Sequence, residues 1–227
     1  YVPKSRNART PNLLRQLNKL SQGLNLSNSE RYLEWCKINS YKDVNKLIIR
    51  EVDQLEYQYR KTEILKYGSE YAAINDILYA DMHIVLQGDM LRKVDAMSMA
   101  NSLEVRTPFL DHELVDFVFT LPDSFKINQS VQKKILKDVF QNQLPGELIS
   151  RPKHGFEVPL LGWFKNELYE KINNLWLNRD FIKSQNLFNP DKIELLNKQL
   201  FSSNPGDIQA TIWALIVFQH WWIKNFD

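Results

Sequence analysis

Basic side chains in and around a short, proline-bounded loop are the residues of this chain best suited to chemistry. The loop spans residues 149–159 and carries Arg151, Lys153 and Gly155 between prolines at positions 152 and 159. Proline fixes its own backbone and restricts the preceding residue, so the loop is predicted to be ordered. Cations held in place can stabilise negative charge on an oxyanion. The alternative is an ordinary loop whose cations are solvated.

Further charged residues precede this loop. Lys133 and Lys137 lie four residues apart and therefore share a helix face, which could bind an anion or could be an ordinary exposed basic face. Arg106 lies close in sequence to Glu104 and Asp111. A partly buried ion pair with one of these acids is as good an interpretation of Arg106 as contact with a substrate.

Composition limits the partners that such a site can have. The 227 residues include 29 basic and 27 acidic side chains, a formal net charge of +2. This balance gives no general attraction to nucleic acid or to an anionic membrane, so we expect neither as a partner and any anion site must be local. The hydrophobic content of 44% is sufficient for a folded core.

Cysteine usage and the longest apolar run bear on location. The single cysteine, Cys36, excludes an internal disulfide framework and favours a reducing compartment, so a cytoplasmic protein is expected. The apolar run Ile212 to Phe218 is far shorter than the roughly 20 residues that span a bilayer.

The four histidines lack metal-ligand spacing, so no metal site is expected within this chain. No GxSxG motif supports a serine hydrolase.

The elements that must position these residues are predicted to be helices, because apolar residues recur at intervals of three and four and β-type alternation is scarce. Ser27 and Glu30 have capping-box spacing. Asp89 follows Gly88 and could simply cap a new helix. The expected helical segments are 43–67, 72–86, 89–97, one capped by Asp111, one capped by Ser130, 160–176, one opened by Asn189-Pro190, and 208–226.

Four sequence blocks, in this order, resemble the synthetase half of glutamine-hydrolysing asparagine synthetases. The segment from Gly88 to Ala100 is similar to the family's DDLLVKVDRMSMA helix, and the segment from Ser102 to Asp111 is similar to SLEVRVPFLD. Residues 133–137 resemble its KxxLR step, and Arg151 to Phe156 resembles its RPKxGF loop. Each block alone is weak evidence, but the combination is specific.

The resemblance implies an ATP-dependent ligase that converts aspartate to asparagine. In such enzymes ATP and Mg²⁺ activate the aspartate side chain as β-aspartyl-AMP, and ammonia from glutamine then displaces AMP. Cations that stabilise the transition state more than the ground state would accelerate the activation step. By motif position, Lys153 is the expected catalytic lysine. The residues expected to bind substrate or ATP phosphates are Arg151, Lys133, Lys137, Arg106 and Asp89.

The resemblance also sets expectations for the fold. We expect a mainly α protein, a single helical domain over residues 1–227 that forms the C-terminal, rear portion of an adenine-nucleotide α-hydrolase-like synthetase domain. Most of the parallel sheet would lie upstream of Tyr1, together with the family's SGGxDS and GDGGDE segments and its N-terminal cysteine. We therefore expect the chain alone to be inactive as a synthetase and glutaminase, and to bind ATP weakly.

Other functions are compatible with the same residues. Relatives of this family amidate sugar carboxylates or close β-lactam rings, so the acceptor could be a sugar acid or a β-lactam precursor. A non-enzymatic helical module whose basic loop binds an anionic partner is a further alternative. The apolar last helix should pack deeply against neighbouring helices or a partner surface, for which a homodimer is one candidate.

Overall fold

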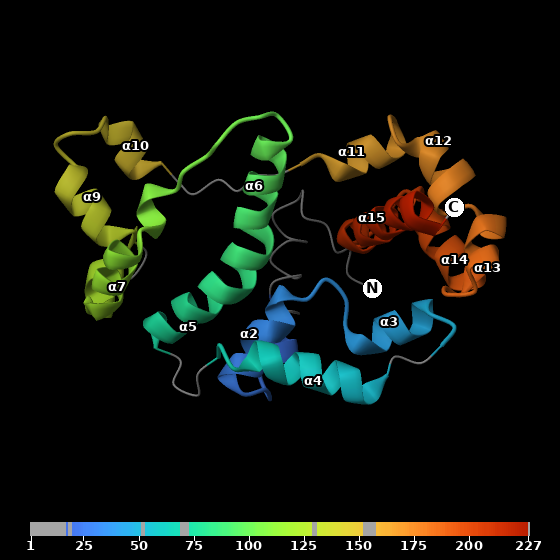
Figure 1. Cartoon of the computed structure of the whole chain (residues 1–227), viewed down its shortest axis with the longest axis horizontal. Coiled ribbons are helices and arrows are strands. Elements are labelled where there is room, and N and C mark those ends of the chain that lie inside the picture. Colours follow the sequence, from blue (N-terminus) through green and yellow to red (C-terminus); the bar gives the residue numbers. More distant parts are fainter. Residues whose placement is uncertain are drawn as a thin grey trace. The chain divides into compact units, whose positions relative to one another are not determined.

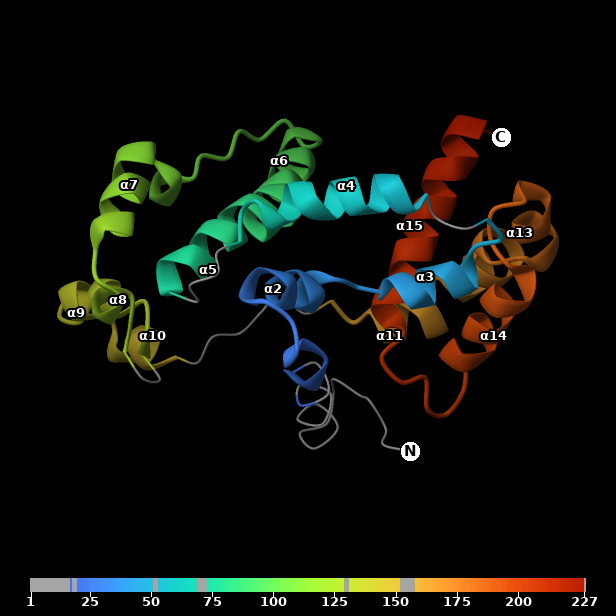
Figure 2. The same cartoon turned by 90° about the horizontal axis from the view of Figure 1, so that it is seen from below.

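The computed structural model describes residues 17, 20–50, 53–68, 73–128, 131–151 and 158–226, and helices dominate these segments (Figure 1, Figure 2). The predicted mainly α class is confirmed. The chain divides into two compact units: the first contains residues 1–63 and 157–227, and the second contains residues 64–156. We describe each unit by itself. The expectation of one domain over the whole chain stays a prediction.

The first unit is built from helices at both ends of the sequence. Its N-terminal part contains α2 (Asn28–Cys36), α3 (Tyr41–Leu47) and most of α4 (Gln54–Leu65). The last two residues of α4 belong to the second unit. Its C-terminal part contains α11 (Leu160–Lys165), α12 (Tyr169–Lys171), the π-helix η3 (Ile172–Trp176), α13 (Arg179–Gln185), α14 (Pro190–Leu200) and α15 (Gln209–Phe226). The single helix predicted over 160–176 is therefore wrong, because turn residues 166–168 separate α11 from α12.

Local capping explains where several of these helices begin. The hydroxyl of Ser27 accepts a hydrogen bond from the backbone N–H of Glu30 and donates one to its carboxylate, which confirms the predicted cap. Asn189 caps α14 by accepting from the N–H groups of Asp191 and Lys192, at 3.0 and 3.2 Å. Pro190, which needs no N–H partner at the first helical position, follows that cap as the sequence predicts.

A short backbone pairing joins the two ends of the first unit. The N–H of Ile49 donates to the carbonyl of Leu187 at 2.8 Å, and the N–H of Asn189 donates to the carbonyl of Leu47 at 2.7 Å. The helix predicted over 43–67 is wrong for this reason. Leu47 and Ile49, near the start of this segment, use their backbone groups for partners that lie about 140 residues away in sequence, a pairing that helix periodicity cannot reveal.

The core of the first unit forms around one face of α15. Ile212, Leu215, Ile216 and Gln219 are buried there, whereas Trp221 on the opposite face is 49% exposed. The predicted packing of this helix against its neighbours is confirmed for one face. The remaining core side chains are Phe164, Ile172, Trp176, Leu177, Ile182, Ile193 and Leu200.

Two glutamines form a polar contact inside this apolar core. The side-chain amide of Gln185, on α13, donates to the carbonyl oxygen of Gln219 at 2.7 Å, and the amide of Gln219 donates back at 3.0 Å. Gln219 is completely buried, while Gln185 is half-buried. Each amide therefore satisfies the other, which removes the cost of burying an unpaired polar group.

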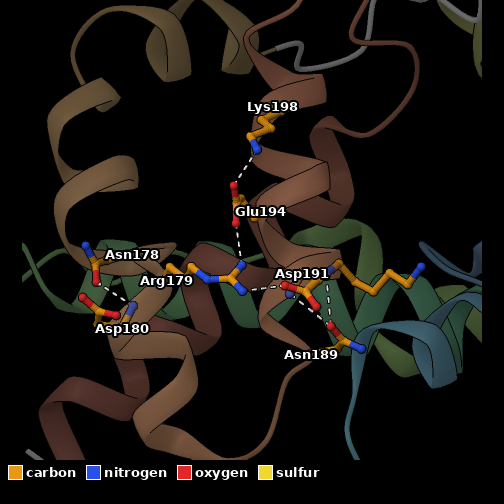
Figure 3. Close-up of polar contacts among 8 residues, drawn as sticks. Asn178, Arg179, Asp180, Asn189, Asp191, Glu194 and Lys198 are labelled. Carbon is orange, nitrogen blue, oxygen red and sulfur yellow. Dashed lines mark hydrogen bonds and ion pairs between the residues drawn. The ribbon is translucent and has the colours of Figure 1, made fainter.

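An exposed network of charges joins α13 to α14 (Figure 3). The guanidinium of Arg179 donates to Asp191 at 2.6 Å and also to Glu194, and Lys198 binds the same Glu194 carboxylate. The hydrogen bonds from Lys198 and then Arg179 hold the pKa of Glu194 below its usual value. Because water screens these exposed charges, we expect the network to align α13 with α14 and to contribute little to the free energy of unfolding.

The second unit is a succession of short elements after one long helix. This helix is continuous through α5 (Ile74–Asp81), the π-helix η1 (Met82–Leu91) and α6 (Arg92–Met99) (Figure 1). The predicted break at Gly88 is therefore wrong. The following elements are the 3₁₀ turn η2 (Pro108–Leu110), α7 (His112–Thr120), α8 (Asp123–Lys126), the antiparallel strands β1 (Ile127–Asn128) and β2 (Val131–Gln132), α9 (Lys134–Phe140) and α10 (Gly146–Ser150).

Capping predictions in the second unit have different outcomes. Asp111 accepts hydrogen bonds from the backbone N–H groups of Glu113 and Leu114, which confirms the predicted cap of α7. Ser130, the predicted cap of the next helix, lies outside the described residues. That helix, α9, begins only at Lys134, after the two short strands.

The second unit buries few of its own side chains. Within its described residues, 64–68, 73–128 and 131–151, only Ala80 is buried, and large apolar side chains such as Met97 and Phe109 are 62% and 69% exposed. Its clearest internal contacts join α5 to the end of α7. There the amide of Asn75 donates to the carbonyl of Phe119 at 3.0 Å, and Tyr79 contacts the Phe119 ring edge to face.

In the described part of the chain, no helix is both long enough and apolar enough to cross a bilayer.

The glutamine pair predicts an asymmetric effect on stability. Gln185→Leu should lower the free energy of unfolding by about 1–3 kcal/mol, because the fully buried amide of Gln219 loses its partner. Gln219→Leu should cost less, since the half-buried amide of Gln185 can turn to water. The double leucine variant should recover part of the loss. Urea unfolding of the three variants tests this, and equal losses in the two single variants would contradict the assignment.

Candidate functional site

The predicted site residues with a described position all lie in the second unit. They are Asp89, Arg106, Lys133, Lys137 and Arg151. Lys153, the expected catalytic lysine, lies outside the described residues, as does the rest of 152–157. The structure therefore describes the elements on both sides of the basic loop and the residues that accompany it in the sequence motifs.

Asp89 lies in the π-helix η1 and not at a helix start. Its side chain is exposed, and its carboxylate accepts a long 3.4 Å contact from the ammonium of Lys93, one turn further along. The alternative role of Asp89 as an N-cap is wrong, because the helix continues through it. π-Helical turns within α-helices are frequent at functional sites, and the sequence carries no periodicity signal that would have predicted this one.

Arg106 lies in the extended segment between α6 and η2. Its guanidinium binds the carboxylate of Glu104 at 2.9 Å, and the Arg106 side chain is 85% exposed. The predicted ion pair forms with Glu104, but it is exposed and not partly buried as predicted, and the Asp111 carboxylate instead caps α7. An exposed pair of this kind contributes little to stability. It leaves Arg106 accessible to a ligand.

Two of the motif segments place a residue other than glycine in the left-handed backbone region. Ser102 (φ 56°) ends α6, where its N–H donates to Met99 and the N–H of Leu103 donates to Ser98. This pattern is a Schellman motif, which usually has glycine at that position. Lys133 also has φ 56° and lies immediately before α9. Such strain is common at functional sites, and neither position was predicted from the sequence.

Lys137 and Arg151 belong to the two helical segments that precede the basic loop, α9 and α10. Lys137 lies on α9, where its N–H donates to the carbonyl of Lys133 at 3.1 Å. Lys133 itself precedes the helix with a left-handed backbone, so the predicted helix face shared by both lysines is wrong. Arg151 is exposed at the end of α10, and its N–H donates to the carbonyl of Glu147 at 2.9 Å. Both Arg151 and Lys133 are therefore open to solvent, while Lys137 is half-buried.

These cations suit an anionic ligand better than a metal ion. Exposed Lys133 and Arg151 can donate to phosphate or carboxylate oxygens without giving up a buried partner. Within the part of the chain that the structure describes, no group of three His, Cys, Asp or Glu side chains is arranged to hold a metal. Asp89 is a lone carboxylate beside Lys93, so the described residues do not form a Mg²⁺ site.

Comparison with known proteins gives a family match over almost the whole chain. The family model described as "Asparagine synthase" matches residues 1–223. Asparagine synthetase [glutamine-hydrolyzing] 1 of Bacillus subtilis (strain 168) is 29% identical over 206 residues, which cover 87% of this chain and 31% of that protein. The chain thus spans about a third of the length of this relative.

Shorter matches agree with this assignment. Asparagine synthetase [glutamine-hydrolyzing] 3 of the same organism is 40% identical over 65 residues, covering 29% of this chain and 11% of the relative. The asparagine synthetase [glutamine-hydrolyzing] of Rattus norvegicus is 36% identical over 84 residues, covering 34% of this chain and 15% of the relative. No solved structure matches the chain.

The left-handed backbone of Lys133 predicts opposite effects of one substitution on stability and on anion binding. Lys133→Gly should raise the free energy of unfolding by about 1 kcal/mol, because glycine adopts φ 56° without a Cβ clash. Lys133→Ala should not, since alanine keeps the Cβ. If Lys133 binds phosphate, both variants weaken binding equally. Thermal unfolding and pyrophosphate titration of the two variants test this, and equal stability of the variants would contradict the strain.

Proposed function

Because the chain belongs to the asparagine synthase family, we propose that it forms part of an ATP-dependent ligase that converts aspartate to asparagine. In this proposal the aspartate carboxylate is activated as β-aspartyl-AMP, and ammonia released from glutamine forms the amide. The observation that carries the proposal is the family match over residues 1–223, in which the four motif blocks keep their order. ATP, Mg²⁺, aspartate and ammonia are the proposed small-molecule partners.

The role that we propose for this chain is to supply cations to the phosphates of ATP. Attack of a carboxylate on the α-phosphate builds negative charge, and fixed donors accelerate the step when they bind that charge more strongly in the transition state. Lys153 is the proposed catalytic group, with Arg151 and Lys133 binding phosphate beside it. The exposure of Arg151 and Lys133 supports this role, because neither is committed to a buried ion pair.

Arg106, Asp89 and Lys137 have proposed positions at the edge of the same site. Arg106 is accessible despite its pair with Glu104, and Asp89 is accessible on η1. Mg²⁺ ligands are assigned to other parts of the enzyme, because the described residues lack a suitable acidic cluster. We propose that the whole domain has the adenine-nucleotide α-hydrolase-like fold, with its parallel sheet contributed by sequence outside this chain.

The exposed apolar side chains of the second unit support the need for such additional polypeptide. Met97, Phe109, Phe117 and Val139 are each 57–69% exposed, and contiguous apolar surface is typical of an interaction site. We propose that the N-terminal part of the enzyme covers this surface and contributes the nucleotide-binding loop. We place the enzyme in the cytoplasm, where Cys36, the one cysteine of this chain, would remain reduced.

The natural reading frame distinguishes this ligase from a non-enzymatic binding module. If the reading frame encodes an SGGxDS segment upstream of Tyr1, that segment would supply the pyrophosphate-binding loop that accompanies these motifs in the family. A reading frame without such a segment would remove the basis for the ligase. The acceptor is then identified by assaying the full-length protein with aspartate and with sugar acids in the presence of ATP, Mg²⁺ and glutamine.

Lys153→Ala in the full-length enzyme should reduce the rate of asparagine formation by at least about a hundredfold, since loss of one fixed donor to developing charge typically costs roughly 10²–10³ in rate. Lys153→Arg should also be poor, because a planar guanidinium does not replace a compact ammonium. Glutamine hydrolysis should be nearly unchanged and reports that the variant is folded.

Lys46→Ala provides the matched control, because Lys46 is exposed on α3, in the first unit, and paired with Asp43. It should leave asparagine formation unchanged. Retention of most synthetase activity by Lys153→Ala at saturating ATP and aspartate would show that the loop is structural.

A further inference from the structure

One ammonium group ties three elements of the second unit together, and it is not among the proposed ligand-binding cations. Lys126, the last residue of α8, is half-buried. Its ammonium donates to the side-chain carbonyl of Asn75 on α5 and, at 3.0 Å, to the backbone carbonyl of Leu121, which caps the end of α7. It also lies over the ring of Phe119, 5.6 Å from the ring centre. Lys126 therefore joins α5, α7 and α8.

These contacts match the donors of the ammonium group. An ammonium has three N–H donors, and the carbonyls of Asn75 and Leu121 accept from two of them. The third can point at the face of Phe119, where the π electrons attract a cation. The carbonyls at the end of a helix carry partial negative charge, which also favours a cation beside Leu121. Lys126 is thus suited to holding elements in place and not to binding a phosphate.

Asn75 closes this node from the other side. Its side-chain N–H donates to the backbone carbonyl of Phe119 at 3.0 Å, while its side-chain carbonyl accepts from Lys126. Both ends of the Asn75 amide are therefore used. The end of α7 is held by the amide on α5 and by the ammonium on α8.

The chain runs directly from Lys126 into the hairpin that ends at Lys133. The first residue of β1, Ile127, pairs with Gln132, the last residue of β2. The backbone positions of Lys126 and Lys133 thus flank this pair at the open end of the hairpin. In addition, α8 contacts α9, the helix that Lys133 precedes. The side chain of Lys126 is fixed by its partners, whereas Lys133 is exposed.

We propose that Lys126 is a positioning residue for Lys133. The proposal rests on the proposed function, in which Lys133 binds a phosphate of ATP. Ala80 is the only fully buried residue among the described residues of the second unit, so polar ties have to supply much of its order. By holding the base of the hairpin against α5 and α7, Lys126 fixes the point from which the Lys133 side chain extends. A misplacement of about 1 Å can cost a reaction roughly a hundredfold.

Steady-state kinetics of the full-length enzyme test this role through a double-mutant cycle. Lys133→Ala should raise the KM for ATP about tenfold with little change in kcat, because a phosphate contact of the ground state is lost. Lys126→Met keeps the length of the side chain and removes its charge. It should raise the KM for ATP roughly threefold to tenfold and leave the KM for aspartate unchanged. In the double variant, the KM for ATP should match that of Lys133→Ala within about twofold.

Three further variants separate positioning from general damage. Lys126→Arg should keep the KM for ATP within about twofold of the unmodified value, because a guanidinium can donate to both carbonyls and lie over an aromatic ring. Asn75→Leu removes the other half of the node and should repeat the effect of Lys126→Met, so the test does not depend on the folding of one variant. Lys46→Met, on α3 in the first unit, should change neither KM. Glutamine hydrolysis reports the folding of each variant.

The outcomes distinguish this inference from the proposed function. A double variant no worse than Lys133→Ala supports positioning. If Lys133→Ala raises the KM for ATP but Lys126→Met does not, or if the two effects multiply in the double variant, only the positioning role of Lys126 is wrong. An unchanged KM for ATP in Lys133→Ala would show that Lys133 does not bind phosphate, which overturns its proposed role and the positioning role together.

Discussion

Packing of one face of α15 is the interaction on which the first unit depends. Ile212, Leu215 and Ile216 bury their side chains against helices α11 to α14, and each full burial of such a side chain contributes about 1.5–3 kcal/mol. Three polar contacts then position the surrounding segments against this core. They are the glutamine pair, the exposed charges of α13 and α14, and the backbone pairing near Ile49. These polar contacts are individually weaker than the apolar burial.

The second unit has the opposite character. It carries the family motifs, yet Ala80 is the only fully buried residue among its described residues. The same exposure that leaves Arg106, Lys133 and Arg151 accessible to a ligand also leaves the unit with little core of its own. The hydrogen-bond donors of a ligase site must be fixed in place before the reaction. If they had to move during the reaction, they would stabilise the charge of the transition state less. In the proposed ligase, contacts from outside this unit would therefore have to fix these donors.

Sequence reasoning succeeded where the determinants are local. The caps at Ser27, Asp111 and Asn189 depend on side chains within three residues of the groups that they bind, so spacing alone predicts them. It failed where a distant partner decides the backbone, as in the pairing that divides the segment 43–67. It also could not reveal the π-helix or the left-handed Lys133, because both depend on tertiary context and not on hydrophobic periodicity.

Hydrogen exchange of the 227-residue chain tests most directly the claim that the two units differ in independent stability. We predict that the amides of α15 exchange slowly, by global unfolding, because their helix forms one side of the only extended apolar core in the described residues. The amides of α7, α9 and α10 should exchange much faster, through local opening. Equal protection of these helices and α15 would contradict the account, because it would show that the unit carrying the motifs is stable without additional polypeptide.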